Sequence, residues 1–444
     1  MSSSADRNDR PVNLDVLIVD WQGGLRGKRL PFEQRQKILS GDARMPLSTQ
    51  TLDIWGDDCD HITGLGLSIG DPDGFCIPDA AAFHTQPWNP GSEQILCTLH
   101  TSEGVPSDYD VRALLQKQLD QLKSAGLNPV VAVELEFYAL DNSTRCSGRP
   151  KVPEQLNISG KPDDLQLYDM RILDAMQTLL SRVQSFAQIM NIPVETQLAE
   201  FGPGQFEINL KHQSNALDAA DHAVLFKQLV DRAASECGML ASFMAKPYTQ
   251  HAGCGQHVHV SLLNDAGSNV FDMPDGEKLQ HGVAGALARL VETQLLFAPN
   301  ANSYRRLQPD NFAPVRLDWG YDHRGVAVRI PETSGPGARI EHRVAGADAN
   351  PYLVLLAVIG AIVDGLENKL PLTQDPLLAG QSPSGQLLTH DWLTAIERFE
   401  KSSWARTLLG HTFHEKYAAI KRHEAQTINK QVTDIELATY LSRV

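Results

Sequence analysis

Two glutamates separated by one residue stand in the segment VVAVELEFYAL, at positions 130–140. The segment has the pattern of a β-strand, in which successive side chains point to opposite faces. Glu134 and Glu136 therefore share one face, and apolar residues occupy the other: Val131, Val133, Leu135 and Phe137. Because adjacent carboxylates repel each other, this face should bind a cation.

Three more segments with a strand pattern have ionisable side chains on one face and apolar side chains on the other. They are ETQLAEFGPGQFEINL with Glu200 and Glu207, GQHVHVSLL with His257 and His259, and RIEHRV with Glu341 and Arg343. Carboxylates with an occasional imidazole are ligands of hard divalent cations, so convergence of the segments predicts a Mg²⁺ or Mn²⁺ site. The alternative is that each strand has its own solvated polar face and the four never meet, because alternating strands are common.

A run of arginines follows between positions 305 and 343, threaded through apolar residues. Its members are Arg305, Arg306, Arg316, Arg324, Arg329, Arg339 and Arg343. Guanidinium groups pair well with carboxylate and phosphate oxygens, and arginines beside a metal site suit phosphoryl transfer. For any single arginine, and above all for Arg305 and Arg316, a surface ion pair is the simpler interpretation.

The elements that must position these residues fall into two predicted domains, after a flexible N-terminus at 1–13. Residues 14–106 contain short apolar runs and Gly- and Pro-rich turns, which indicate a small, mostly β domain. A helix with Ser107 as its N-cap and Gly126 at its C-terminus opens the second domain, 107–444. Apolar periodicity predicts further helices at 168–190, 215–244, 280–298, 350–368 and 390–408.

Composition narrows the function classes. A chain of 444 residues with a formal net charge of −15 is a poor candidate for binding nucleic acid or an anionic membrane. The six cysteines form no C-x-x-C pair, so free thiols in a reducing, cytoplasmic compartment are expected. The N-terminus does not resemble a signal peptide, and the apolar run at 351–366 contains Asp364 and is too short for a bilayer. That run predicts a buried helix.

With these motifs in order, the sequence resembles the type I branch of the glutamine synthetase family. The matching segments, over nearly all of 108–368, are VELEFYAL, AEFGPGQFEINL, GCGQHVHVSL, NSYRRLQP, RGVAVRIP and ARIEHRVAGADANPYL. The resemblance implies an α+β fold: an N-terminal β-grasp domain and a catalytic domain with a curved antiparallel sheet backed by helices. It also implies a homo-oligomer, a dodecamer of two stacked hexameric rings, in which one subunit's small domain completes the next subunit's site.

The resemblance also implies roles for individual positions. The ligands of the first metal match Glu136, Glu200 and Glu207, and those of the second match Glu134, His257 and Glu341. The glutamate-binding positions match Gly253, Arg306 and Arg343, and the nucleotide-binding positions match Glu195, His259, Ser261, Arg329 and Arg339. Arg324 matches the arginine that stabilises the transferring phosphoryl group.

The family's chemistry, carried to this chain, would use ATP and two or more Mg²⁺ or Mn²⁺ ions to phosphorylate the γ-carboxylate of glutamate. An amine would then displace phosphate from the γ-glutamyl phosphate. Because an ammonium ion is not nucleophilic, a carboxylate must first remove its proton, and Asp53 and Glu200 are the candidates. A non-catalytic, nucleotide-binding relative is the other class considered, although such relatives usually lose metal ligands that this chain keeps.

Residues that depart from the family pattern indicate which amine is the acceptor. Phe312 stands where glutamine synthetases carry an acidic residue over the ammonium site, which favours a substituent with a carbon chain. Tyr168 and Asp53 are expected to line the same pocket. These departures resemble those of γ-glutamylpolyamine synthetases and other glutamate–amine ligases, which implies that putrescine-like amines are favoured over a small monoamine or ammonium. In the alternative, Phe312 merely packs and Asp310 takes the acidic role.

Overall fold

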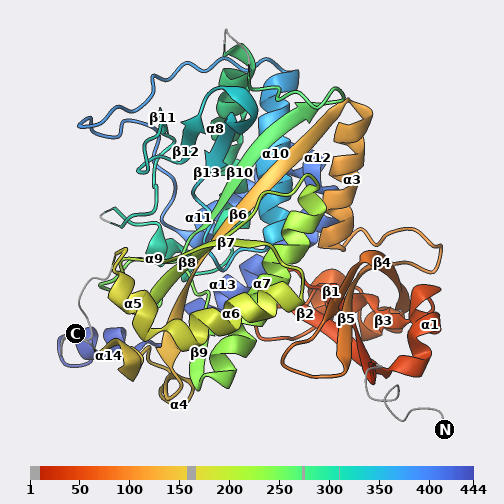
Figure 1. Cartoon of the computed structure of the whole chain (residues 1–444). Helices are drawn as coiled ribbons and strands as arrows, with labels where there is room; N and C mark the ends of the chain where they lie inside the picture. Colours follow the sequence, from red (N-terminus) through yellow and green to blue (C-terminus); the bar gives the residue numbers. More distant parts are fainter. Residues whose placement is uncertain (1–10, 158–166, 273–275, 310) are drawn as a thin grey trace.

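The structure is a computed structural model, and it describes every residue except 1–10, 158–166, 273–275 and 310 (Figure 1). Most of the N-terminal segment expected to be flexible, and the alternative acidic residue Asp310, lie outside the described residues. Strand β1 begins at Asn13. The two regions expected from the sequence, a strand-rich N-terminal part and a larger α+β part, are both present.

In the part of the chain that the structure describes, the N-terminal region forms a five-stranded sheet in the order β2-β1-β5-β4-β3. β1 and β5 run parallel, and the other neighbours are antiparallel. The strands are β1 (Asn13–Val19), β2 (Leu25–Pro31), β3 (Arg44–Pro46), β4 (Asp73–Thr85) and β5 (Ser92–His100). The short helical elements between them are η1 (Phe32–Gln34), α1 (Arg35–Leu39), η2 (Leu47–Gln50), α2 (Asp60–Thr63) and η3 (Leu67–Ile69).

Both faces of this sheet bury apolar residues, because β1 alternates between two cores. Leu14, Val16 and Ile18 fill a small core of the N-terminal region. Leu17 and Val19 join the main core of the molecule instead. The N-terminal sheet is therefore packed firmly against the rest of the chain.

A second sheet, eight-stranded among the described residues, runs through the centre of the molecule in the order β11-β12-β13-β10-β6-β8-β7, with β9 paired to β6. Its neighbours are antiparallel except for β11 and β12. The strands are β6 (Leu127–Asp141), β7 (Val194–Ala199), β8 (Gln205–Leu210), β9 (Met239–Ser242), β10 (Gln256–Asn264), β11 (Trp319–Tyr321), β12 (Val328–Glu332) and β13 (Arg339–His342). β6 and β10 form the long central pair in Figure 1.

Helices back this sheet on its apolar side. α10 (Pro351–Glu367) packs against α8 (Glu277–Phe297), α7 (Ala216–Glu236) and α3 (Val111–Ser124). Its residues are almost all buried, which confirms the interpretation of 351–366 as a buried helix. The remaining helical elements are α4 (Thr144–Ser147), η4 (Glu154–Leu156), α5 (Met170–Ala175), α6 (Gln177–Ile189), α9 (Ser303–Arg306), η5 (Gly335–Gly337), α11 (Trp392–Lys401), α12 (Ser403–Leu409), α13 (His411–Asn429) and α14 (Asp434–Tyr440).

Several predicted helix boundaries were wrong for identifiable reasons. The first helix starts at Val111, where the Asp110 side chain accepts a hydrogen bond from Ala113 N, rather than after Ser107. The helix expected over 215–244 ends at Glu236, since Gly238 takes a left-handed φ of +70° and the chain turns into β9. The helix expected over 390–408 divides at Ser402, whose side chain caps α12.

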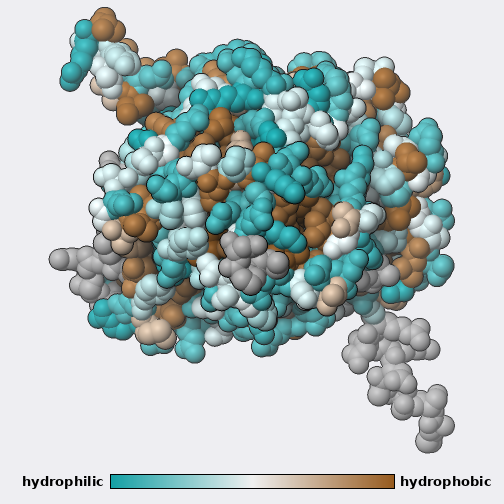
Figure 2. Space-filling model, turned by 90° about the horizontal axis from the view of Figure 1, so that it is seen from above, coloured by the Kyte–Doolittle hydropathy of each residue, from teal (hydrophilic) through white to brown (hydrophobic). Residues whose placement is uncertain are grey.

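The six cysteines are all free, as expected. Among the described residues, no helix has both the length and the apolar character that crossing a membrane requires. Seen from above, the surface is mostly hydrophilic, and hydrophobic residues gather around a depression near the middle of that face (Figure 2).

Candidate active site

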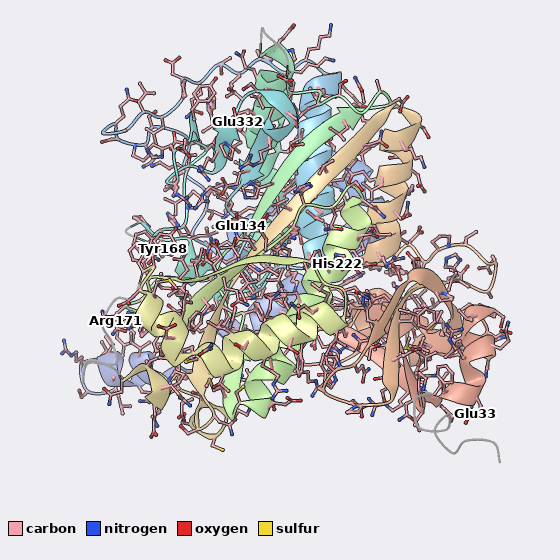
Figure 3. All side chains as sticks on the ribbon, viewed as in Figure 1. Glu33, Glu134, Tyr168, Arg171, His222 and Glu332 are labelled. Carbon is pink, nitrogen blue, oxygen red and sulfur yellow. The ribbon has the colours of Figure 1, made fainter. Side chains whose placement is uncertain are left out.

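The register of the central sheet brings the ionisable residues of four strands together. Glu134 on β6 lies opposite His257 on β10, and Glu136 on β6 lies opposite Glu207 on β8. Glu341 on β13 in turn lies opposite His259 on β10. Directly paired residues have Cβ atoms about 5 Å apart, so these polar faces form one surface. Figure 3 places Glu134 near the centre of the sheet.

The first expected set of metal ligands is intact in the structure. Glu136, Glu200 and Glu207 each offer a carboxylate oxygen, and the three oxygens lie within 4.8 Å of one another. Glu200 directly follows β7, and its backbone N–H donates to Gln205 O at 2.9 Å across the tight turn to β8. The turn thus aims a third carboxylate at the two strand glutamates.

The electrostatics of this set reveal uncompensated negative charge. Burial, with repulsion from Glu134, Glu136 and Glu200, raises the pKa of Glu207 to about 9. Burial and the charge of Glu136 raise the pKa of Glu200 to about 7. A bound divalent cation would offset both the burial and the repulsion between the carboxylates, because its charge stabilises their ionised form.

The second expected set of ligands, Glu134, His257 and Glu341, falls into two adjoining groups. Glu134 and His257 form one compact group with Glu207, and Glu134 forms another with His259 and Glu341. Glu341 also pairs with two arginines: Arg343 Nη1 donates to its Oε1, and Arg329 Nη1 donates to its Oε2 at 2.8 Å. Glu134 belongs to both groups and so links the three expected ligands, whose shared role stays a prediction.

Imidazole and amide groups surround Glu134 itself. His257 Nδ1 lies 3.2 Å from one carboxylate oxygen, and His259 Nε2 lies 3.0 Å from the other. Asn209 Nδ2 also donates to Glu134, at 2.9 Å. Although burial acts to raise the pKa of Glu134, these histidine contacts hold it well below its usual range. Glu134 is therefore an ionised acceptor at neutral pH, as a metal ligand must be.

The donors fit hard divalent cations. Five buried or half-buried carboxylates, which we call the acidic cluster, meet beside imidazole groups: Glu134, Glu136, Glu200, Glu207 and Glu341. Oxygen donors with one or two imidazoles suit Mg²⁺ or Mn²⁺ better than softer metals. The alternative of four separate, solvated strand faces does not describe this chain.

A pair of glycines and a buried arginine close one end of the cluster. A Cβ on Gly255 would lie 2.8 Å from Arg306 Nη2 and 3.0 Å from His257 Nε2, and a Cβ on Gly253 would lie 2.8 Å from Arg306 Cγ. Gly255 N donates to Glu136 Oε2 at 2.8 Å. Arg306, almost wholly buried, donates to Val344 O at 2.7 Å. These contacts place Gly253 and Arg306, two of the three expected glutamate-binding residues, next to the first metal set.

Two further arginines connect the cluster to its surroundings. Arg343 Nε donates to Arg324 O at 3.1 Å, so the loop that carries Arg324 is tied to the strand beside Glu341. Arg324 is exposed, and its charge acts to lower the pKa of Glu200. Arg329 bridges Glu341 and Asp322.

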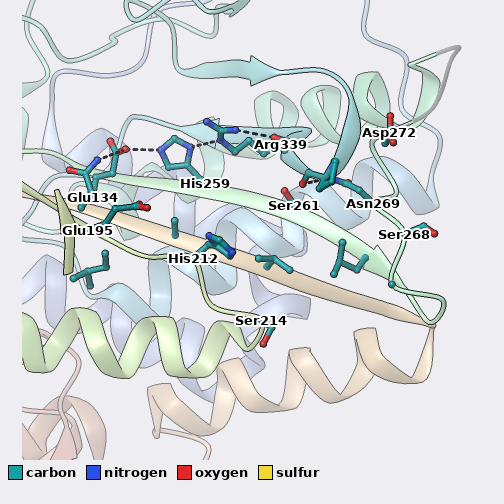
Figure 4. A pocket seen from close by; sticks show the side chains of 18 residues that line it. Glu134, Glu195, His212, Ser214, His259, Ser261, Ser268, Asn269, Asp272 and Arg339 are labelled. Atoms are coloured by element: carbon teal, nitrogen blue, oxygen red, sulfur yellow. Dashed lines mark hydrogen bonds and ion pairs between the residues drawn. The ribbon is translucent and has the colours of Figure 1, made fainter. Parts of the chain in front are cut away.

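A cavity of about 750 Å³ opens on the other side of Glu134 (Figure 4). A row of hydrogen-bonded side chains runs along it from Glu134 through His259 to Arg339, whose Nε lies 3.3 Å from His259 Nδ1. Glu195 and Ser261 line the same cavity. Apart from Arg329, all of the expected nucleotide-binding residues therefore share one pocket.

The sequence interpretation missed several residues of this cavity. They include His212, Ser268, Asn269 and Asp272. Asn269 Nδ2 donates to Ala338 O at 2.8 Å and to Pro336 O at 3.2 Å, which holds the η5 loop over the cavity. A single amide in a turn gives no periodic signal, so only the fold could reveal this role.

Comparison with known proteins decides the family. The model of the glutamine synthetase catalytic domain matches residues 108–440. The chain belongs to the glutamine synthetase family. The resemblance noted in the sequence is thereby confirmed.

Two relatives are similar over nearly their whole length. The gamma-glutamylputrescine synthetase PuuA of Escherichia coli (strain K12) is 37% identical over 428 residues, which cover 96% of this chain and 90% of the relative. A glutamate–isopropylamine ligase of a Pseudomonas species is 32% identical over 445 residues, covering 97% and 95%. A solved structure described as apo GmaS without ligand has a TM-score of 0.85 over all of both chains at 24% identity, a likeness of fold.

The residues that depart from the glutamine synthetase pattern lie in loops. The Phe312 ring is 62% exposed and stacks on Phe201, with 4.1 Å between ring centroids. Phe201 was not singled out in the sequence, although it directly follows Glu200. Its backbone N–H donates to Glu200 Oε2 at 3.3 Å, so the aromatic pair sits at the edge of the acidic cluster.

Among the described residues, no hydrogen bond or ring contact joins the other two residues expected near the amine to that pair. Tyr168, at a left-handed φ of +55°, is largely exposed, and its backbone N–H donates to Ala199 O at 2.9 Å, one residue before Glu200. Asp53 is buried in its own loop, where its carboxylate accepts from Trp55 N at 2.9 Å and Asp57 N at 3.0 Å. Its expected role in a neighbouring subunit's site stays a prediction.

Proposed function

We propose that this chain is an ATP-dependent carbon–nitrogen ligase that joins the γ-carboxylate of glutamate to an amine, with putrescine-like amines as its acceptors. The observation that carries the proposal is the acidic cluster, placed between the Arg306 side of the site and the cavity at His259 and Arg339. Membership of the glutamine synthetase family supports the same reaction.

The two sides of the cluster suit the two substrates that must react. In this proposal Arg306 and Arg343 hold the carboxylates of glutamate, since buried guanidinium groups bind carboxylates in a fixed orientation. The triphosphate of ATP lies along His259, Ser261 and Arg339. The γ-carboxylate and the γ-phosphate then meet at the cluster.

Two or more Mg²⁺ or Mn²⁺ ions, held by Glu136, Glu200 and Glu207 and by the groups around Glu134, would supply charge neutralisation at the phosphates. Arg324 stabilises the transferring phosphoryl group from the loop anchored by Arg343. Phosphorylation turns a poor electrophile into a γ-glutamyl phosphate, and the amine expels phosphate from it.

The stacked Phe201 and Phe312 rings support an amine with a carbon chain. The exposed Phe312 ring, stacked on the half-buried Phe201 next to Glu200, offers apolar area to methylene groups and a π-face to an ammonium ion. Glu200 accepts the amine's proton in this arrangement, with Asp53 of a neighbouring subunit as the second candidate. The curated relatives named for putrescine and isopropylamine support the same class of acceptor.

The test is phosphate release from ATP by the purified protein with glutamate and Mg²⁺, with putrescine, spermidine, ethanolamine, isopropylamine and ammonium compared at equal concentration. We expect release to require glutamate and to be fastest with a diamine or polyamine. Preference for a small monoamine would revise the acceptor, and preference for ammonium would make the protein a glutamine synthetase. No release with any amine would favour a non-catalytic nucleotide-binding relative.

A cytoplasmic location and a ring-shaped homo-oligomer complete the proposal. The free thiols suit a reducing compartment. A ring would let Asp53 serve a neighbouring subunit. Sedimentation velocity of the purified protein tests the assembly, and a stable monomer with full activity would reject it.

A further inference from the structure

A buried lysine outside the acidic cluster contacts the loop that carries Phe312. Lys246 lies in the segment between β9 and β10 and is almost wholly buried. Its Nζ donates to Asn311 Oδ1 at 2.9 Å and also to His251 O. We propose that Lys246 is a positioning residue for the choice of amine, because it holds the Phe312 ring in place through Asn311. This inference rests on the proposed function and names a residue that determines its specificity.

The backbone around Lys246 gives its ammonium group a fixed base. Lys246 N donates to Asn302 Oδ1 at 2.8 Å, and Asn302 Nδ2 donates to Lys246 O at 3.0 Å. Ala245 O, one residue earlier, accepts from Cys254 N at 2.8 Å. Asn302 directly precedes α9, so these bonds join the segment between β9 and β10 to the short helix that carries Arg306.

Asn311 connects the lysine to the Phe312 loop. While its Oδ1 accepts from Lys246, its Nδ2 donates to Arg305 O at 3.2 Å and to Arg306 O at 3.1 Å. Both ends of the amide are therefore hydrogen-bonded, which fixes the side chain and restricts the backbone of Asn311. Phe312 is the next residue, so a fixed Asn311 limits where its ring can lie.

The Phe312 ring depends on such support, because it is largely exposed and comes from a loop. A hydrogen bond from an ammonium group is stronger than one between neutral groups, and little water competes for a buried lysine. Neither the acidic cluster nor the nucleotide cavity includes Lys246 or Asn311. Loss of the ammonium group should therefore release the loop and leave those two parts of the site as they are.

The first readout needs no turnover. Hydrogen–deuterium exchange of the purified full-length protein, followed by mass spectrometry, reports on the amides of Asn311 and Phe312. Lys246→Met removes the ammonium group, and Asn311→Leu removes its acceptor at a half-buried position where the chain should still fold. Both should raise the exchange rate about tenfold or more, whereas Lys401→Met, at an exposed lysine on α11, should not change it. Unchanged exchange in both loop variants would overturn the proposal.

The second readout is the ratio of kcat/KM for putrescine to kcat/KM for ammonium. A folding defect lowers both values and leaves the ratio, whereas a displaced ring lowers the value for putrescine alone. We expect the ratio to fall about tenfold in Lys246→Met and in Asn311→Leu, and no further in the double variant, because the lysine acts through Asn311. The KM for ATP should stay constant. Lys246→Arg, which keeps a charged donor, should restore part of the ratio.

The two readouts separate this inference from the proposed function. An unmodified protein that prefers ammonium would reject the proposed acceptor and with it the role in choosing the amine, while exchange would still decide whether Lys246 holds the loop. If the unmodified protein prefers putrescine and the ratio is unchanged in both single variants, Lys246 has no part in that preference. A double variant whose ratio falls by the product of the two single effects would show that the lysine does not act through Asn311.

Discussion

Four of the five carboxylates of the acidic cluster stand on paired strands and Glu200 directly follows one, whereas the residues expected around the amine stand in loops. Glu134 and Glu136 are fixed by the register of β6 with β10 and β8. Phe201 and Phe312 come instead from two separate turns whose rings happen to stack. The comparison suggests that the chemistry common to the family is built into the sheet, and that the choice of amine is left to loops that can change without disturbing it.

Glu207→Gln is the most severe test of the metal-binding carboxylates on the central sheet. The change keeps the shape but removes a ligand shared by two of the metal-binding groups, so phosphate release should fall by about 100-fold or more. Without divalent cations at neutral pH the variant should melt at a higher temperature than the unmodified protein, because the amide is neutral without the proton that Glu207 must take up on folding. Glu397→Gln, at an exposed glutamate on α11, is the control. Near-normal turnover of Glu207→Gln would remove Glu207 from the metal site.

Arg306→Lys tests the side of the acidic cluster at which glutamate is proposed to bind. A lysine cannot reproduce both the bond to Val344 O and a forked contact with a carboxylate, so the KM for glutamate should rise about 10- to 100-fold. The KM for ATP should stay nearly constant. The neighbouring, exposed Arg305→Lys is the matched control. An equal rise in both KM values would indicate a structural defect rather than a lost substrate contact.

Phe312→Ala tests the loop residues that are proposed to select the amine. Loss of the stacked ring should raise the KM for putrescine about tenfold, near the upper end of what an aromatic contact contributes. The KM for ammonium should not rise, because ammonium has no carbon chain to place there. Phe75→Ala, in β4 of the N-terminal sheet, serves as the control. If the relative rates with the different amines stay the same in Phe312→Ala, the ring has no part in selecting the amine.

The smallest expected effect is a dependence of metal-free stability on pH. The pKa of Glu207 is raised to about 9 and that of Glu200 to about 7, so the folded protein keeps protons that the unfolded chain releases near pH 4.5. Stability in the presence of a chelator should therefore fall as the pH rises from about 4.5 to about 9. Added Mg²⁺ should flatten this slope. Melting curves that show the same slope with and without Mg²⁺ would contradict the account of the cluster.

The same comparison explains which parts of the structure the sequence could predict. Strand alternation placed Glu207 and His257 on the correct faces, because a period of two leaves little freedom. It could not tell that Arg329 and Arg343 would both pair with Glu341, since that depends on side chains from separate segments of the chain. Nor could the sequence pattern predict the stacking of Phe201 on Phe312, because residues in turns show no periodic spacing of apolar positions.

Helix boundaries show a similar limit. The periodicity of 215–244 continued past Glu236, but a single glycine with a positive φ ended the helix and began β9. The hydrogen bond from Lys246 to Asn311 was equally invisible, because residues so distant in sequence meet only where the segment before β10 lies beside α9.

The most direct test of the central claim follows oxygen from glutamate to phosphate. Glutamate labelled with ¹⁸O in its γ-carboxylate is incubated with the protein, ATP, Mg²⁺ and putrescine, and the inorganic phosphate is analysed by mass spectrometry. The account predicts one ¹⁸O atom in each phosphate released, because the γ-carboxylate oxygen that accepts the phosphoryl group leaves with it. Unlabelled phosphate would show that ATP is hydrolysed without activating glutamate, and would contradict the proposed function.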